Sequence, residues 1–193
     1  MVKDNNKKLN TLEDFEMEGS TLVRYTGKSK KVIVPEGITA IGEGAFADCS
    51  KLTSITIPNS VTEIGGGAFY ECRSLKSITI LGKLINIDSW TFFNCSSLVS
   101  VIIPHGVTSI DTFTFSGCSA LQSVIIPSSV KCIEDAAFAD CSSLTNITFK
   151  GTKEQWNNID FPIVYAMAPM WDDETGDYTI HCTDGDIVKA DVL

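Results

Sequence analysis

The chain has 193 residues, of which 44% are hydrophobic and 20% are charged, a composition typical of a single globular domain. Its 24 acidic and 15 basic residues give a net charge of −9. This charge argues against nucleic acid as a partner, because nucleic-acid binding needs a basic surface. No apolar run approaches the roughly 18–20 residues of a membrane-spanning helix, so we expect no membrane insertion.

The first ten residues contain lysines but are not followed by the apolar stretch of a secretory leader. We therefore expect the protein to be extracellular or on the cell surface if a leader has been removed, and cytoplasmic otherwise.

A 23-residue period dominates the rest of the chain. Leucine follows it at Leu52, Leu75, Leu98, Leu121 and Leu144. Phenylalanine follows it at Phe46, Phe69, Phe92, Phe115 and Phe138, and cysteine at Cys49, Cys72, Cys95, Cys118 and Cys141. Several columns in register over five units predict a solenoid, in which each unit buries its apolar side against its neighbours.

Within one unit, the alternating residues 54–57 predict a strand with one buried face, which Pro58 ends. Residues 61–64 predict a second short extended segment, and the glycines at 65–67 predict a tight corner. Residues 68–72 predict a single helical turn, which places Phe69 and Cys72 toward the interior.

The repeat resembles the BspA-type bacterial leucine-rich-repeat family, whose unit runs Ala-Phe-x-x-Cys-x-x-Leu-x-x-Ile-x-Ile-Pro-x-x-Val-x-x-Ile-Gly. The resemblance implies a right-handed solenoid of mostly short parallel strands with one short helical turn per repeat, capped at both ends. It also implies a secreted or surface-displayed protein. The partner implied is a protein, in some members a host matrix protein bound in cell adhesion.

The same resemblance divides the chain into a polar tail (1–14) and one solenoid domain (15–193). Within that domain, 15–30 resembles the family's N-terminal hairpin cap, 31–150 holds the repeats, and 151–193 resembles the C-terminal cap. Leu81 and Leu84 replace the usual proline and valine, and Asp88, Asp111 and Glu134 replace glycine. None of these changes alters the period, so we expect the fold to be unaffected.

We expect no catalytic residue, metal site or cofactor, and therefore no enzyme. Five cysteines belong to a repeat column, where they act as small buried apolar residues too far apart for unstrained disulfides. Cys132 and Cys182 lie outside that column and are expected to be inert thiols unless exposed. His105 and His181 occur in no nucleophile motif or zinc spacing. Carboxylates at 172–177 and 184–186 suggest calcium, but without the spacing of an EF-hand.

Two surfaces are candidate binding sites. On the strand face, columns of serine and threonine form a hydroxyl-rich surface, the strand ribbon, with an apolar centre at Ile102 and Ile125. On the turn side, aromatic residues stand where other units have small or polar ones, at Tyr70, Trp90, Phe93 and Phe113. The ribbon is explained equally by strand propensity. The aromatics are explained by contact with a partner, by self-association or by local packing.

Overall fold

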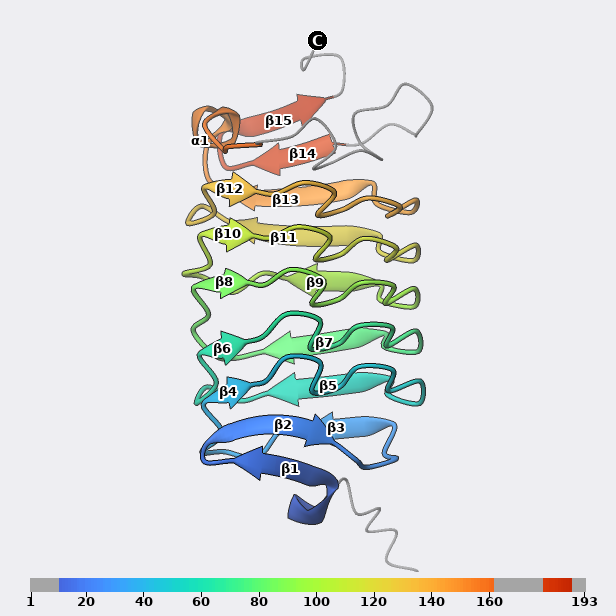
Figure 1. The fold of residues 1–193 in the computed structure, drawn as a ribbon. Coiled ribbons are helices and arrows are strands. Elements are labelled where there is room, and N and C mark those ends of the chain that lie inside the picture. The colour runs from blue at the N-terminus through green and yellow to red at the C-terminus, as the bar shows by residue number, and fades with distance from the viewer. Residues whose placement is uncertain (1–10, 162–178, 189–193) are drawn as a thin grey trace, which may run out of the picture.

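In the computed structural model, the described residues, 11–161 and 179–188, form an elongated stack of coils (Figure 1). Each coil consists of a two-residue strand, a tight turn and a longer strand. Coils 1 to 5 contain, in order, β4 (Ala40–Ile41) and β5 (Ser54–Ile57), β6 (Glu63–Ile64) and β7 (Ser77–Ile80), β8 (Asn86–Ile87) and β9 (Ser100–Ile102), β10 (Ser109–Ile110) and β11 (Ser123–Pro127), and β12 (Cys132–Ile133) and β13 (Asn146–Lys150). The predicted solenoid of short parallel strands is confirmed.

The N-terminal end of the stack is an antiparallel hairpin of β1 (Phe15–Glu18) and β2 (Thr21–Tyr25), preceded by a 3-10 helix at Leu12–Asp14. β2 also pairs in parallel with β4, while β3 (Lys31–Ile33) pairs with β5. The hairpin thus covers the open end of the core and turns an antiparallel edge outward.

The C-terminal end contains the one α-helix of the described residues, α1 (Lys153–Asn157), whose first turn is capped by the Thr152 hydroxyl. β14 (Thr179–Cys182) pairs in parallel with β13, and β15 (Gly185–Val188) pairs antiparallel with β14. Trp156 of α1 packs edge-on against Phe149, with 5.3 Å between ring centroids. Aromatic packing therefore closes this end of the core.

The core is a ladder of phenylalanine rings, one from each coil. Successive rings stack with centroids 5.1–5.3 Å apart, in the order Phe46, Phe69, Phe92, Phe115 and Phe138. These rings are fully buried. Buried cysteines line the ladder, and each thiol donates to the carbonyl of the phenylalanine one coil earlier, as from Cys95 to Phe69 at 3.3 Å. The predicted apolar role of the cysteine column is therefore accompanied by a hydrogen bond between coils.

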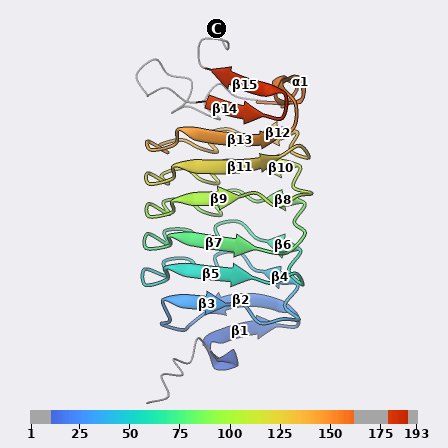
Figure 2. The same cartoon turned by 180° about the vertical axis from the view of Figure 1, so that it is seen from behind.

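Two strand faces flank this core. The short strands face the viewer in Figure 1 and the longer strands face the viewer in Figure 2. Both faces are interrupted at the same level: β6 and β8 belong to different sheets, and so do β7 and β9. On the turn side, backbone bonds still cross from coil 2 to coil 3, as from Phe69 N–H to the Thr91 carbonyl at 2.8 Å. The solenoid is thus continuous on its turn side and interrupted on its strand faces.

The interruption coincides with the connection between β7 and β8, where Leu81 replaces the proline of other units. A non-proline residue has an N–H, and Leu81 donates it to the Ile57 carbonyl of coil 1 at 3.0 Å. Gly82 lies so close to the connection between β5 and β6 that a Cβ there would be 1.9 Å from the Val61 carbonyl oxygen. The connection between β7 and β8 therefore contacts residues that precede it in the stack. In Figure 1 the spacing from β6 and β7 to β8 and β9 is wider than the spacing between other neighbouring coils.

The segment expected to form a helical turn in each unit is a run of overlapping tight turns. In coil 2 these turns are closed by backbone bonds from Tyr70 to Gly67 and from Cys72 to Phe69, at 2.8 and 3.1 Å. Two residues of the run, Gly67 and Glu71, have φ of +60° and +58°. These left-handed residues interrupt the helical path, so the chain reverses direction within one turn.

Candidate binding surface

The tight turns place large aromatic residues on a backbone that favours glycine. The first left-handed position of coils 1 to 5 is held by Gly44, Gly67, Trp90, Phe113 and Ala136. Trp90 and Phe113 have φ of +64° and +57°. For residues other than glycine this conformation costs roughly 1–2 kcal/mol, and bulky side chains rarely adopt it. Coils 3 and 4 therefore hold aromatic rings in place at a local cost in stability.

The four predicted aromatic side chains are in contact and form one surface, which we call the aromatic patch (Tyr70, Trp90, Phe93 and Phe113). Trp90 lies 4.9 Å from Phe93 and 4.7 Å from Phe113 between ring centroids, and Tyr70 stacks on Phe93 at 5.2 Å. Trp90 is 41% exposed and the other three are half-buried. The patch spans coils 2 to 4 and crosses the level at which the strand faces are interrupted.

Two buried threonines fix the turns that carry Trp90 and Phe113. The Thr91 hydroxyl donates to the Asp88 carbonyl, and the Thr114 hydroxyl donates to the Asp111 carbonyl, both at 2.7 Å. Both threonines are fully buried, and coils 1, 2 and 5 have alanine at this position. The hydroxyls therefore stabilise the backbone of the aromatic turns in a way that the glycine turns do not share.

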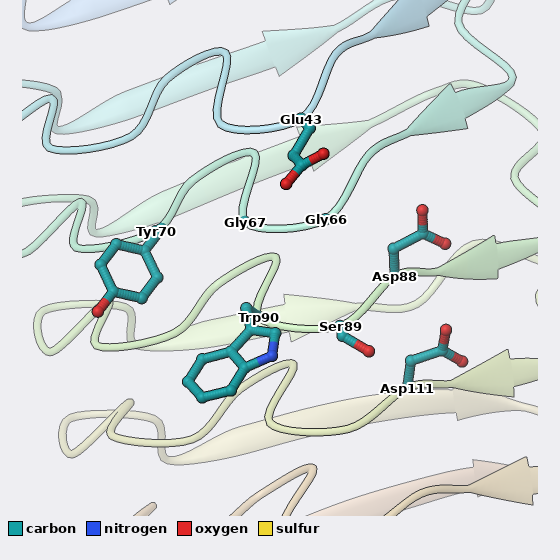
Figure 3. Close-up of a pocket in the computed structure, with 8 residues that line it drawn as sticks. All are labelled: Glu43, Gly66, Gly67, Tyr70, Asp88, Ser89, Trp90 and Asp111. Carbon is teal, nitrogen blue, oxygen red and sulfur yellow. The ribbon is translucent and has the colours of Figure 1, made fainter.

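Carboxylates border the same turns. A groove of about 670 Å³ is lined by Glu43, Gly66, Gly67, Tyr70, Asp88, Ser89, Trp90 and Asp111 (Figure 3). We call it the acidic groove. Asp88 and Asp111 follow β8 and β10 directly and lie side by side in the figure, while the rings of Tyr70 and Trp90 lie at the other end. Burial raises the pKa of Asp88 above its usual range, and the neighbouring Asp111 carboxylate adds to the rise.

In the sequence, these carboxylates stand out only as departures from the glycine of the family unit. The signal that connects them to the patch was present, because Asp88 and Asp111 each stand two residues before an aromatic residue at a left-handed position. The sequence alone does not place the two features together, because they belong to different repeat columns whose proximity depends on the path of the turn.

The strand ribbon lies on a different face from the aromatic patch. Ile102 and Ile125 are direct ladder partners on β9 and β11, the face shown in Figure 2. Ile102 is 64% exposed, whereas Ile125 is half-buried. The apolar centre predicted for the ribbon is therefore present, but only one of its two members extends well into solvent.

Most of the exposed large apolar side chains of the described residues lie near the interruption between coils 2 and 3. Those within this stretch are Leu81, Ile85, Trp90, Val99 and Ile102. Leu81 and Ile85 border an open groove of about 510 Å³, together with Pro104 and His105. Leu81 and Ile85 thus expose apolar surface in one groove, and exposed apolar patches mark interaction sites.

The cysteines and histidines form no arrangement with evident catalytic or metal-binding chemistry among the described residues. All seven cysteines are free thiols, and burial raises the pKa of Cys95 and Cys132 to about 12, which disfavours the reactive thiolate. His181 contacts Asp186 at 2.9 Å. No group of three potential metal ligands exists in the described ranges, and the acidic segment 172–177 lies outside them.

No helix within 11–161 or 179–188 has the length and apolar character needed to cross a bilayer.

Comparison with known proteins agrees with the repeat. A family model of the BspA type leucine rich repeat region matches residues 19–145 in six copies. A leucine rich cell surface protein of Faecalibacterium prausnitzii is 37% identical with a TM-score of 0.70, and the match covers 72% of this chain but 38% of that protein. A leucine rich repeat protein of T. pallidum is 31% identical with a TM-score of 0.68, covering 73% of this chain and 71% of that one. No curated protein matches the chain.

Proposed function

Because the chain belongs to the BspA-type leucine-rich repeat family, as its repeat predicted, we propose that it is a non-catalytic protein-binding module with an adhesin-like role at the bacterial surface. Leucine-rich repeat proteins generally mediate protein interactions, and a similar solved structure is a bacterial cell surface protein. This chain spans well under half of that relative, so the partner and the location of the whole protein are part of the proposal.

The aromatic patch is the surface that best supports this function. Its defining observation is that Trp90 and Phe113 occupy left-handed backbone positions at which coils 1 and 2 have glycine. The solenoid path does not require these rings, since glycine follows the same path without the conformational cost. Local rules of this kind are broken mainly at functional sites, where the cost is offset by binding.

The strand ribbon is the second contact surface of the proposal. Ile102 is the more exposed of its two apolar members, and threonine takes its place on β5 and β7 of the preceding coils. Ile102 lies on β9, whereas the aromatic patch lies on the turns between the short and the longer strands, so the two are separate contact surfaces.

An intracellular interaction scaffold is the second candidate function. The observation that favours it is the state of the cysteines, all seven of which are free thiols, as is usual for proteins in a reducing compartment. Both candidates use the same surfaces and differ in the source of the partner.

The test uses binding of the purified chain to a panel of immobilised extracellular-matrix proteins. We expect saturable binding to at least one of them, with an affinity that is at least tenfold weaker in Trp90→Gly and in Phe113→Gly. Glycine relieves the backbone cost at these positions, so both variants should remain folded by circular dichroism. Leu12→Ala removes an exposed apolar side chain far from the patch and serves as the matched control.

Three results would count against this assignment. Equal binding by Trp90→Gly and the wild-type chain would exclude the aromatic patch. Loss of binding only in Ile102→Thr, which carries the residue found on β7, would transfer the site to the strand ribbon. Absence of binding to every matrix protein would contradict the adhesin-like role.

A further inference from the structure

The acidic groove combines aromatic rings with carboxylates in one open site. It is lined by residues of coils 1 to 4, from Glu43 to Asp111. Gly66 and Gly67 have no side chains, so the groove between Glu43 and Trp90 exposes backbone (Figure 3). Acidic residues alone are usually just solvated, but here they flank a half-exposed indole.

The negative charge of this groove is not neutralised within the described part of the chain. Neither lysine nor arginine lines it. The Asp88 and Asp111 carboxylates accept hydrogen bonds from Asn86 and Ser109, which are neutral donors. Arg73, which interacts with Tyr70 at the edge of the groove, is paired with Glu71, whose other carboxylate oxygen accepts from Asn94 at 2.9 Å. A ligand cation would therefore meet carboxylates without a charged partner.

The chemistry that fits such a site is a planar cation. A guanidinium group stacks on an indole face and hydrogen-bonds carboxylates in two-point fashion, which a lysine ammonium does less well. Four successive coils at the strand spacing of about 4.8 Å extend over roughly 14 Å, which is the length of about four extended residues. The groove thus has the dimensions of a short peptide segment rather than of a single ion.

We propose that the acidic groove binds an arginine-bearing extended segment of the protein partner, with one guanidinium stacked on Trp90 and another, at the other end of the groove, paired with Asp88 and Asp111. This inference rests on the proposed function and specifies the chemistry of the partner.

The experiment titrates the ¹⁵N-labelled chain with a blocked Gly/Ser peptide that has arginine at three alternate positions. Its matched probe has citrulline, the neutral isostere, at the same positions. The readout is the Trp90 indole N–H signal, assigned by its absence in Trp90→Gly. We expect a saturable shift with the arginine peptide, at least tenfold weaker with the citrulline peptide.

A charge-matched pair of variants separates the site from the overall charge of −9. Asp88→Asn with Asp111→Asn keeps the size of both side chains and should weaken arginine-peptide binding by roughly tenfold, since two partly exposed ion pairs are lost and each contributes modestly. Glu18→Gln with Glu36→Gln removes the same charge from exposed positions outside the groove and should change it less than twofold.

The outcomes distinguish this inference from the proposed function. Equal binding of both peptides, lost in Trp90→Gly, would keep a protein-binding patch and overturn the cationic segment. Equal weakening by both double variants would show non-specific attraction and overturn it, as would absence of any shift. A Trp90 shift produced by an uncharged glucose oligosaccharide but by neither peptide would assign the groove to carbohydrate. Dimerisation that Trp90→Gly abolishes would assign it to a second copy of the chain.

Discussion

The turns of coils 1 and 2 and the turns of coils 3 and 4 follow the same backbone path with different residues. At the first left-handed position, the former have Gly44 and Gly67 and the latter have Trp90 and Phe113. The hydrogen bonds between coils are the same on both sides, as from Gly44 N–H to Gly66 and from Trp90 N–H to Thr112, each at 3.1 Å. The path is therefore set by the repeat and its bonds, and the aromatic rings are additions to it.

This comparison separates two kinds of aromatic residue in the same coil. Phe92 belongs to the buried ladder that every coil shares, while Phe93, the next residue, belongs to the aromatic patch that only coils 2 to 4 form. Adjacent residues of one turn thus have different roles: Phe92 packs in the core, and Phe93 contributes to the surface.

The largest expected effect comes from breaking the shared ladder. Phe92→Ala removes a fully buried ring between Phe69 and Phe115, and such truncations cost about 3–5 kcal/mol. Phe93→Ala is the matched variant on the half-buried patch and should cost about 1–2 kcal/mol, from lost ring contacts and partial burial. Equilibrium unfolding in urea measures both. Equal losses of unfolding free energy in the two variants would mean that the aromatic patch contributes as much to stability as the buried ladder.

A smaller effect is expected from exchanging the residues at the left-handed position. Gly67→Ala should destabilise the chain by about 1–2 kcal/mol, because alanine disfavours φ of +60°. A Cβ at Gly67 would meet its nearest atom, Tyr70 Cβ, at 3.7 Å, so the cost is conformational rather than steric. In Trp90→Gly the conformational cost is relieved but the ring contacts are lost. The two effects oppose each other, so the free energy of unfolding should stay within about 1 kcal/mol of the wild-type value. A loss of 3 kcal/mol in the same urea series would make Trp90 a structural residue.

Much of this architecture could be predicted from the sequence, since a period shared by leucine, phenylalanine and cysteine columns determines which side chains are stacked. The contact among Tyr70, Trp90, Phe93 and Phe113 could also be anticipated, because equivalent positions of neighbouring coils must lie near each other. Their role in binding remains a prediction.

The interruption of both strand faces could not be anticipated from the period, which is intact through Leu81 and Leu84. It coincides with the close approach of Gly82 to the Val61 carbonyl, a three-dimensional contact that no repeat column records. The tight turns in place of a helical turn depend on the positive φ at Glu71 and its equivalents, of which only Gly117 is a glycine, so the repeat column carries little sequence signal for this conformation.

The smallest effect is expected from the carboxylate that distinguishes coil 3 from coil 2. Burial, with Asp111 and Glu63 nearby, raises the pKa of Asp88 above its usual value of 3.8, so the folded chain holds this proton more tightly than the unfolded chain. The resulting stabilisation is complete below pH 3.8 and is lost as the pH rises through the folded pKa. Asp88→Asn should therefore raise the Tm slightly at pH 7 and converge on the wild-type Tm near pH 3.5, while Glu18→Gln controls for net charge. A variant that is less stable than the wild type at pH 7 would show that ionised Asp88 supports the turn instead of straining it.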